Sequence, residues 1–260
     1  MMNKLKILAL AAVLGMISCQ SRVALPLLSA SAFDTTVNGQ TISLYTLTNA
    51  SGSAVQITNY GGRVVSLWTP DREGNFRDVV LGFDNIADYL SSKSGNQGAV
   101  VGRYANRIED RRFTLDSVEY LLAGNEAARI APVGVADFNR AIFTPKPVTN
   151  ARKEQSLELN YLSPDGEAGF PGNADVTVIY TLTNDNELKI EYIATTDRPT
   201  VLSLTNHSFF NLRGGEGDIY DYELYVNADS YLEIKEGTIP TGNIVTVEGT
   251  PLDFRTPIPI

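Results

Sequence analysis

VTVIYTLTNDNELKIEYIA, residues 176–194, is the stretch that indicates the fold most clearly. Its two halves alternate apolar and polar residues, and they flank Asn184-Asp185-Asn186, residue types that favour turns. Side chains of a β-strand point alternately to its two faces, so a period of two suits a half-buried strand. The stretch therefore predicts two strands, over residues 176–182 and 188–194.

The same alternating pattern recurs along the chain. Further strands are expected over residues 33–37, 42–47, 55–60, 63–68 and 201–205. Asn38-Gly39 predicts a hairpin between the first two, because both residues accept the positive φ of a type I′ turn, and Gly61-Gly62 lies between the next two. Helical periodicity is weak, and only residues 85–90 predict a turn or two of helix. Many short strands joined by turns predict an all-β sandwich or barrel, in one continuous domain.

The composition limits the function. The chain has 260 residues, a net charge of −9, 43% hydrophobic residues, one His and one Cys. The apolar fraction is too high for a disordered chain, and an acidic surface is repelled by phosphates, which argues against nucleic-acid binding. One His and one Cys exclude a poly-His metal cluster, an internal disulfide and a Cys-rich zinc site. Acid–base chemistry must therefore use carboxylates, Tyr, Lys or the one His.

The N-terminus has the features of an export signal. Lys4 and Lys6 precede an apolar run over residues 7–17, which is too short to span a bilayer core of ~30 Å. Met16-Ile17-Ser18-Cys19 resembles a bacterial lipobox, with Met16 in place of the usual Leu. The resemblance implies a signal peptide over residues 1–18, lipidation of Cys19, a tether to residue 32 and a domain over residues 33–260. Such a protein would be an exported lipoprotein, in the periplasm or anchored to the outer membrane; the alternative is an ordinary signal peptide followed by an unmodified Cys.

Four short sequence motifs contain residues that are typical of a binding or catalytic site. They are GRYANRI (102–108), GEAGFPGN (166–173), TNHSFFNL (205–212) and TPLDFR (250–255). The one histidine, His207, follows an expected strand and lies among Asn, Ser and aromatic residues, which can bond sugar hydroxyls and cover the apolar face of a sugar. Taken singly, each string also fits a structural role: a hydrogen-bonded histidine, or a turn with charged flanks.

Together and in this order, the strings resemble those of the aldose 1-epimerase, or galactose mutarotase, family. That family has GRxANRI, GxxGFPGN, TNHSYFNL and TPFDFR, and this chain differs at Phe209 and Leu252. The resemblance runs from about residue 33 to residue 260, and NYGGR (59–63) and LGF (81–83) add to it. It implies a large galactose-mutarotase-like β-sandwich, a monomer that acts on a free aldose and needs no cofactor. Some relatives are described with calcium, but no ligand set stands out in this sequence.

The resemblance also implies roles for individual residues. Mutarotation protonates the ring oxygen of the sugar and deprotonates its anomeric hydroxyl, so it needs a general acid and a general base. His207 would be the acid, since histidine exchanges protons near neutral pH. Arg107, with Asn106 beside it, would bind sugar oxygens, and Asp253 would accept hydrogen bonds from sugar hydroxyls. Ser208 and Phe209 would complete the substrate site.

Two departures from the family pattern leave the activity open. The family has a second active-site His in a Leu-His-Gly-Gly string, and alignment on Phe138 places Pro132 at that position. The sugar contact of this His is therefore lost unless Arg129 or Arg140 provides it instead. The family's general base is a Glu in a Leu-Glu-Thr-Gln string beyond TPFDFR, and the sequence reaches Ile260 without it. We therefore expect a truncated chain whose incomplete sandwich leaves sheet edges and core faces uncovered.

Three functions remain open from the sequence. The first is an epimerase of free hexoses such as glucose and galactose. The second is a catalytically impaired, mutarotase-like carbohydrate-binding protein that lacks the base. The third is an epimerase of phosphorylated hexoses, which would favour additional basic groups near the site.

Overall fold

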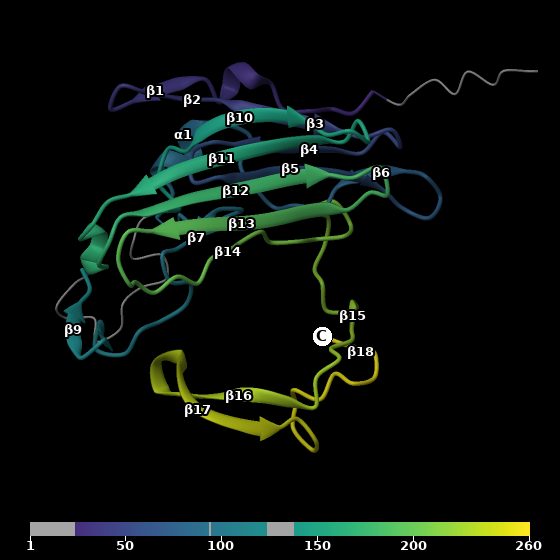
Figure 1. Ribbon diagram of the computed structural model, residues 1–260. Helices are drawn as coiled ribbons and strands as arrows, with labels where there is room; N and C mark the ends of the chain where they lie inside the picture. Colours follow the sequence, from purple (N-terminus) through teal and green to yellow (C-terminus); the bar gives the residue numbers. More distant parts are fainter. Residues whose placement is uncertain (1–23, 94, 124–137) are drawn as a thin grey trace, which may run out of the picture.

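A computed structural model describes residues 24–93, 95–123 and 138–260. The predicted signal peptide and lipid anchor Cys19 lie outside the described residues, as do Arg129 and Pro132. Two antiparallel sheets of four strands each form the body of the molecule (Figure 1).

The first sheet has the order β3-β4-β5-β6. Its strands are β3 (Leu44–Thr48), β4 (Ala54–Thr58), β5 (Arg63–Pro70) and β6 (Phe76–Asp78). Gly61 and Gly62 join β4 to β5 with φ angles of 69° and 55°, values that glycine adopts without strain. The predicted strands on either side of this glycine pair are confirmed.

The second sheet has the order β10-β11-β12-β13. Its strands are β10 (Thr144–Thr149), β11 (Gln155–Ser163), β12 (Ala174–Leu182) and β13 (Leu188–Thr196). The register pairs Leu182 with Leu188, so the turn lies at Asn184-Asp185-Asn186 as predicted. Both predicted strands are confirmed, and each extends two residues further from the turn.

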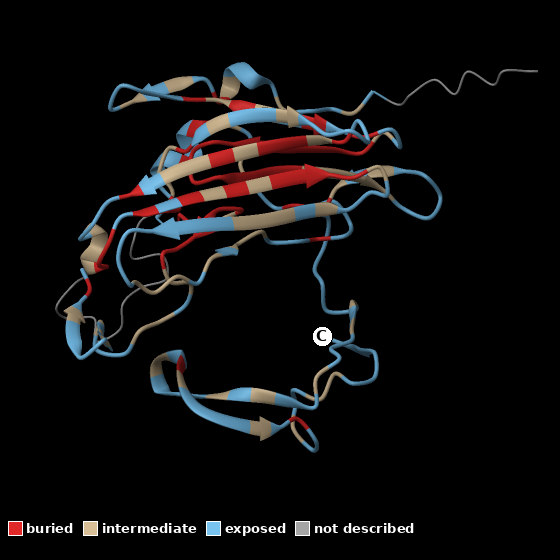
Figure 2. Cartoon of the chain, viewed as in Figure 1, coloured by how far each residue is buried: buried red, intermediate tan, exposed pale blue. Residues whose placement is uncertain are grey.

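The core lies between the two sheets (Figure 2). On β11 and β12, side chains at alternate positions, among them Leu157, Leu159, Val176 and Val178, are 0% exposed. They pack in one cluster with side chains of β4 and β5, such as Ile57 and Val64. The alternation seen in the sequence thus places one face of each sheet in a shared core, which confirms the all-β sandwich.

The N-terminal hairpin differs in part from the prediction. β1 (Thr35–Val37) and β2 (Gln40–Ile42) flank Asn38 and Gly39, whose φ angles of 51° and 78° fit the type I′ turn. The second strand, predicted over residues 42–47, is confirmed except at Ser43, where the chain divides between β2 and β3. The amide of Ser43 donates to Asn59 Oδ1 at 2.9 Å, and the residues that follow join the first sheet as β3.

Two short helical segments lie near this hairpin. The 3₁₀-helix η1 (Ala30–Ala32) falls in the expected tether, and the preceding Leu28 exchanges two hydrogen bonds with the side chain of Gln56. The helix α1 (Ile86–Ser91) confirms the one predicted helix. Asn85 caps α1 by accepting from the amide of Asp88 at 3.0 Å.

The remaining elements are short pairs outside the two sheets. They are β7 (Val100–Val101) with β14 (Thr205–Asn206), β8 (Arg112–Leu115) with β9 (Val118–Leu121), β15 (Glu223–Leu224) with β18 (Ile258–Pro259), and β16 (Ser230–Lys235) with β17 (Ile239–Thr246). Two further 3₁₀-helices are η2 (Glu167–Gly169) and η3 (Glu236–Thr238). The strand predicted over residues 201–205 is wrong except at its end, because its neighbour around Tyr104 forms a single bridge, to Ser203.

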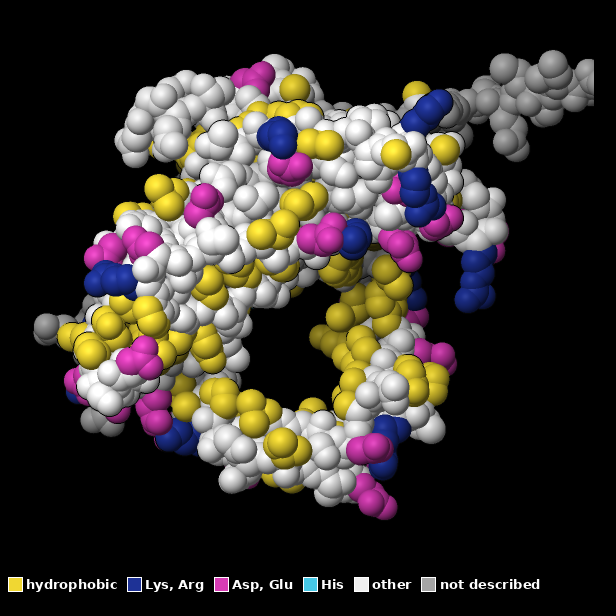
Figure 3. Space-filling view, viewed as in Figure 1, with side chains coloured by type: hydrophobic (Ala, Val, Ile, Leu, Met, Phe, Trp, Pro, Cys, Tyr) yellow, Lys and Arg dark blue, Asp and Glu magenta, His cyan; other side chains and the backbone are white. Residues whose placement is uncertain are grey.

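The β16–β17 ribbon lies apart from the sandwich (Figure 1). Figure 3 shows an opening between the ribbon and the body, with hydrophobic side chains along its rim. No helix in the described part of the chain is both long and apolar enough to cross a membrane.

Candidate active site

The β7–β14 pair positions the backbone of His207, which directly follows β14. β14 pairs with β7 through Thr205 and Asn206, and the ladder continues past the strands. The amide of His207 donates to the carbonyl of Ala99 at 2.8 Å, and its carbonyl accepts from the amide of Gly98 at 3.0 Å. The backbone of His207 is therefore fixed on both sides by residues 98 and 99.

The side chain of Asn206 adds a second constraint on this segment. Its Oδ1 accepts from the amide of Ser208 at 3.0 Å and from Ser208 Oγ at 2.6 Å, and its Nδ2 donates to the carbonyl of Gly98 at 2.9 Å. The first of these bonds closes a turn around His207. Ser208, which we expected to bind substrate, thus directs its hydroxyl to Asn206 in this structure.

An aromatic ring lies beside the imidazole. The ring centroids of His207 and Phe209 are 5.0 Å apart with an interplanar angle of 49°. Phe209 is 46% exposed, so part of its face is open to a ligand. A polar proton donor next to an accessible aromatic face is the combination that a sugar ring requires, with hydroxyls on one side and C–H groups on another.

Arg107 and Asn106 lie in the irregular segment between β7 and β8. Asn106 is exposed and has a φ of 82°. Arg107 is half-buried, and its Nη1 donates to the carbonyl of Gly237 in η3 at 3.0 Å. A guanidinium has five N–H donors, so this contact leaves others for a ligand. The segment thus connects the body of the molecule to the β16–β17 ribbon.

Asp253 lies in the turn between β17 and β18. Its carboxylate accepts from Arg255 Nε at 2.8 Å and from Arg255 Nη2 at 2.7 Å. These hydrogen bonds lower the pKa of Asp253 below its ordinary value, so the group is a carboxylate at neutral pH. Arg255 also donates to Asp229 Oδ1 at 3.3 Å, which ties the turn to the residue before β16.

The structure does not join the expected site residues directly. Across residues 24–93, 95–123 and 138–260, no hydrogen bond or ion pair connects His207 with Arg107 or Asp253. Their segments, after β14, after β7 and before β18, lie on different sides of the opening (Figures 1 and 3). The expected acid, cation and carboxylate thus come from three different segments of the chain.

The acidic residues that follow the His207 string make other contacts. Glu216 is an exposed partner of Arg77 at 3.7 Å, and Asp218 Oδ1 accepts from the amide of Tyr220 at 3.3 Å. Arg140, a possible substitute for the family's second His, is exposed. Within the described ranges, none of these three side chains forms a hydrogen bond or an ion pair with His207.

Sequence reasoning missed Tyr180, which supports the site from within the core. Tyr180 is 0% exposed; its Oη donates to the carbonyl of Gly62 at 2.7 Å and accepts from Asn206 Nδ2 at 3.4 Å. Burial raises the pKa of Tyr180 far above its ordinary value, so the hydroxyl keeps its proton. The available signal was a tyrosine at a core-facing position of an alternating run, where its hydroxyl needs a partner.

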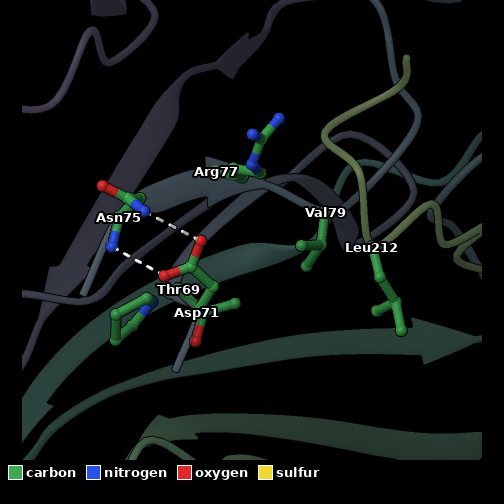
Figure 4. A pocket seen from close by; sticks show the side chains of 7 residues that line it. Thr69, Asp71, Asn75, Arg77, Val79 and Leu212 are labelled. Atoms are coloured by element: carbon green, nitrogen blue, oxygen red, sulfur yellow. Dashed lines mark hydrogen bonds between the residues drawn. The ribbon is translucent and has the colours of Figure 1, made fainter. Parts of the chain in front are cut away.

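A cavity of about 210 Å³ lies elsewhere, at the turn between β5 and β6 (Figure 4). Asp71 and Asn75 lie at its edge, and Asp71 Oδ1 accepts from the amide of Asn75 at 2.8 Å. Leu212, the last residue of the TNHSFFNL string, contributes one wall, but none of the expected site residues lines the cavity. It is therefore separate from the candidate active site.

Clusters of side chains that could hold a metal ion were sought in residues 24–93, 95–123 and 138–260. These residues contain no group of three or more His, Cys, Asp or Glu side chains placed to hold a metal.

Comparisons with known proteins agree with the strings. The family model of aldose 1-epimerase matches residues 43–260. Galactose mutarotase of Bos taurus is 44% identical over 205 residues, which cover 78% of this chain and 58% of that protein. Aldose 1-epimerase of Escherichia coli (strain K12) is 36% identical over 218 residues, which cover 84% of this chain and 62% of that protein. The chain thus spans about three fifths of the length of these relatives.

Solved structures show the same fold. The galactose 1-epimerase of Lactobacillus acidophilus NCFM superimposes with a TM-score of 0.78 at 26% identity, over 88% of this chain and 65% of that one. A GalM/aldose epimerase homologue from C. elegans gives a TM-score of 0.75 at 30% identity, over 84% and 65% of the two chains. Because the family model matches most of this chain, over residues 43–260, the chain belongs to the aldose 1-epimerase family.

Proposed function

We propose that the protein interconverts the α and β anomers of free hexoses such as glucose and galactose. The observation that carries the proposal is His207, the one histidine of the chain, fixed through its backbone beside the exposed ring of Phe209. The relatives named galactose mutarotase and aldose 1-epimerase support it.

The proposed reaction uses His207, Arg107 and Asp253. His207 donates a proton to the ring oxygen while the anomeric hydroxyl loses one, and the C1–O bond of the ring breaks. Rotation about C1–C2 and closure then return the other anomer, with both protons transferred back. Arg107 binds sugar oxygens, and the Asp253 carboxylate accepts from sugar hydroxyls. The proton of the anomeric hydroxyl passes to water, which returns it on closure.

Polarimetry on freshly dissolved α-glucose and α-galactose tests the proposal. We expect a rate above that of buffer, and we expect His207→Ala to abolish it. Leu212→Ala is the control, because this exposed residue belongs to the same string but lies in the wall of the separate cavity. An active protein whose rate survives His207→Ala would refute the mechanism.

A second candidate is a carbohydrate-binding protein without turnover. It is favoured by the single histidine, since the position of the family's second active-site His is Pro132 here. In that case the polarimetric rate equals that of buffer, while galactose raises the melting temperature by binding the folded state. A rate seen only with hexose phosphates would favour the third candidate.

We also propose that the protein is exported, anchored through a lipid on Cys19, monomeric and independent of metal. Lys4, Lys6 and the apolar run before Cys19 support the export signal. In a bacterial host we expect the full chain in the membrane fraction and Cys19→Ser outside it, since acyl chains supply ~0.8 kcal/mol per buried methylene. Sedimentation reports the oligomeric state, and dialysis against a chelator should leave the rate unchanged.

A further inference from the structure

Arg63 is a fully buried guanidinium at the start of β5. It is 0% exposed and is among the largest side chains enclosed in the core. Its Nη1 donates to the carbonyl of Gln97 at 2.9 Å, and its Nη2 donates to the carbonyls of Gly95, at 2.7 Å, and of Asn139. The planar fork of one guanidinium thus binds backbone carbonyls of two separate segments, residues 95–97 and residue 139.

The charge of Arg63 is stabilised without a carboxylate partner among the described residues. Its Cζ lies 5.1 Å from the ring centroids of both Tyr60 and Tyr89, which provides two cation–π contacts. Burial lowers the pKa of Arg63 to about 10, so the group is still charged at neutral pH. Burying a cation is costly, and an apolar residue would avoid that cost; the carbonyls that Arg63 binds give a reason for its presence.

Two of those carbonyls, of Gly95 and Gln97, belong to the segment that binds the backbone of His207. Gly98, the next residue after Gln97, accepts from the amide of Val64 at 3.0 Å and donates to the carbonyl of His207 at 3.0 Å. A Cβ added at Gly98 would lie 2.0 Å from the carbonyl oxygen of Val64, so the segment packs against β5 without room to move. Ala99 accepts from the amide of His207 at 2.8 Å. Backbone contacts therefore run from Arg63 through residues 95–99 to His207.

We propose that Arg63 is a positioning residue that fixes residues 95–99 and, through them, the imidazole of His207. Arg63 lies inside the core and binds the backbone of residues 95–97, and the neighbouring residues 98 and 99 bind the backbone of His207, the proposed acid. The catalytic consequence of this role rests on the proposed function, but the positioning itself does not.

The single histidine makes the proposal directly measurable. In protein labelled with ¹⁵N-histidine, the imidazole and backbone amide signals come from His207 alone. Arg63→Lys keeps the charge but replaces the planar fork with one compact ammonium on a shorter side chain, which does not reproduce the Nη1 and Nη2 contacts in their present geometry. We expect both signals of His207 to shift and broaden in Arg63→Lys, and more so in Arg63→Met. If Arg63→Met does not fold, Arg63→Lys alone decides.

Ile42→Ala is the matched control. Ile42 is buried in the same cluster as Tyr60 and Tyr89, so its truncation destabilises that cluster while removing none of the groups that Arg63 contacts. We expect the His207 signals of Ile42→Ala to stay at their wild-type positions. Unchanged His207 signals in Arg63→Lys, or an equal shift in Ile42→Ala, would overturn the proposal.

Kinetics separate this proposal from the proposed function. If the wild-type protein is active, we expect Arg63→Lys to lower kcat about ten- to a hundredfold with little change in KM, because small displacements of a catalytic group act on the chemical step. A wild-type protein without a rate, whose His207 signals still respond to Arg63→Lys, refutes the proposed function and supports the positioning role. A kcat unchanged in Arg63→Lys counts against the positioning role alone.

Discussion

At the scale of single residues, the site depends on polar groups that the core encloses. Tyr180 brings a hydroxyl into the sandwich, where it joins Gly62 of the β4–β5 turn to Asn206 beside His207. An unpaired buried polar group destabilises the fold, so such a bridge constrains both of its ends.

Tyr180→Phe tests this bridge. Removing the hydroxyl leaves the carbonyl of Gly62 without its donor, and we expect the free energy of unfolding to fall by about 1–3 kcal/mol. The control is Tyr192→Phe, because Tyr192 lies on the neighbouring strand β13 and its hydroxyl has no hydrogen-bond partner among the residues described. Chemical denaturation measures both variants, and equal losses of stability would contradict the role assigned to Tyr180.

The raised pKa of Tyr192 predicts that the free energy of unfolding falls at alkaline pH. Burial raises the pKa of Tyr192 to about 12, whereas an unfolded tyrosine titrates near ~10. The folded state holds this proton more tightly than the unfolded state, so the group's contribution to stability is complete below pH ~10 and is lost as the pH rises to about 12. We expect the free energy of unfolding to fall less steeply over this range in Tyr192→Phe than in the wild type. Parallel curves for the two proteins would show that Tyr192 titrates normally.

At the scale of elements, the alternation of each strand sets which residues carry stability. On β11, Leu159 is 0% exposed between the two sheets, whereas Leu162 is 59% exposed. We expect Leu159→Ala to reduce the free energy of unfolding by about 2–5 kcal/mol, because it leaves a cavity in the core. Leu162→Ala removes the same atoms from an exposed position and should change stability by less than ~0.5 kcal/mol. Similar losses in thermal or chemical denaturation would show that the core does not lie between the sheets.

The same alternation explains how much of the fold could be predicted. The strands over residues 176–182 and 188–194 were found because pattern and turn residues agree locally. The strand over residues 42–47 is interrupted at Ser43, and the pattern did not predict this break because it involves Asn59, which lies 16 residues further along the sequence. No strands were expected over residues 230–246, where a register shift between Leu232 and Ile234 interrupts the alternation.

The candidate site was likewise predicted only in part. His207, Arg107 and Asp253 were found because each lies in a recognisable string. The residues that support them, Tyr180 and Arg63, act through contacts across 118 and 34 sequence positions respectively. Local patterns carry no record of such contacts, so only the fold reveals them.

At the scale of the whole molecule, the opening separates two parts of unequal stability. The sandwich has a shared core, whereas β16 and β17 pair only with each other among the residues that the structure describes. The ribbon is joined to the body near Arg107, through its bond to Gly237, and by an exposed ion pair of Lys235 with Glu109 at 2.5 Å. Exposed ion pairs contribute about 0–1 kcal/mol, and an isolated two-stranded ribbon is marginally stable.

Hydrogen exchange measures this difference across the molecule. We expect the amides of β16 and β17 to exchange much faster than those of β11 and β12, since the ribbon can open without disrupting the core. If Arg107 and Asp253 both bind sugar, a bound aldose would link the two sides of the opening, and galactose should slow exchange in the ribbon while leaving the sandwich unchanged. Galactitol, the open-chain alditol that keeps the configuration of galactose at C2 to C5 but cannot form a ring, is the matched control. Protection of the ribbon equal to that of the sandwich without sugar would show that the two parts unfold as one, and equal slowing by both compounds would show that the site does not recognise a sugar ring.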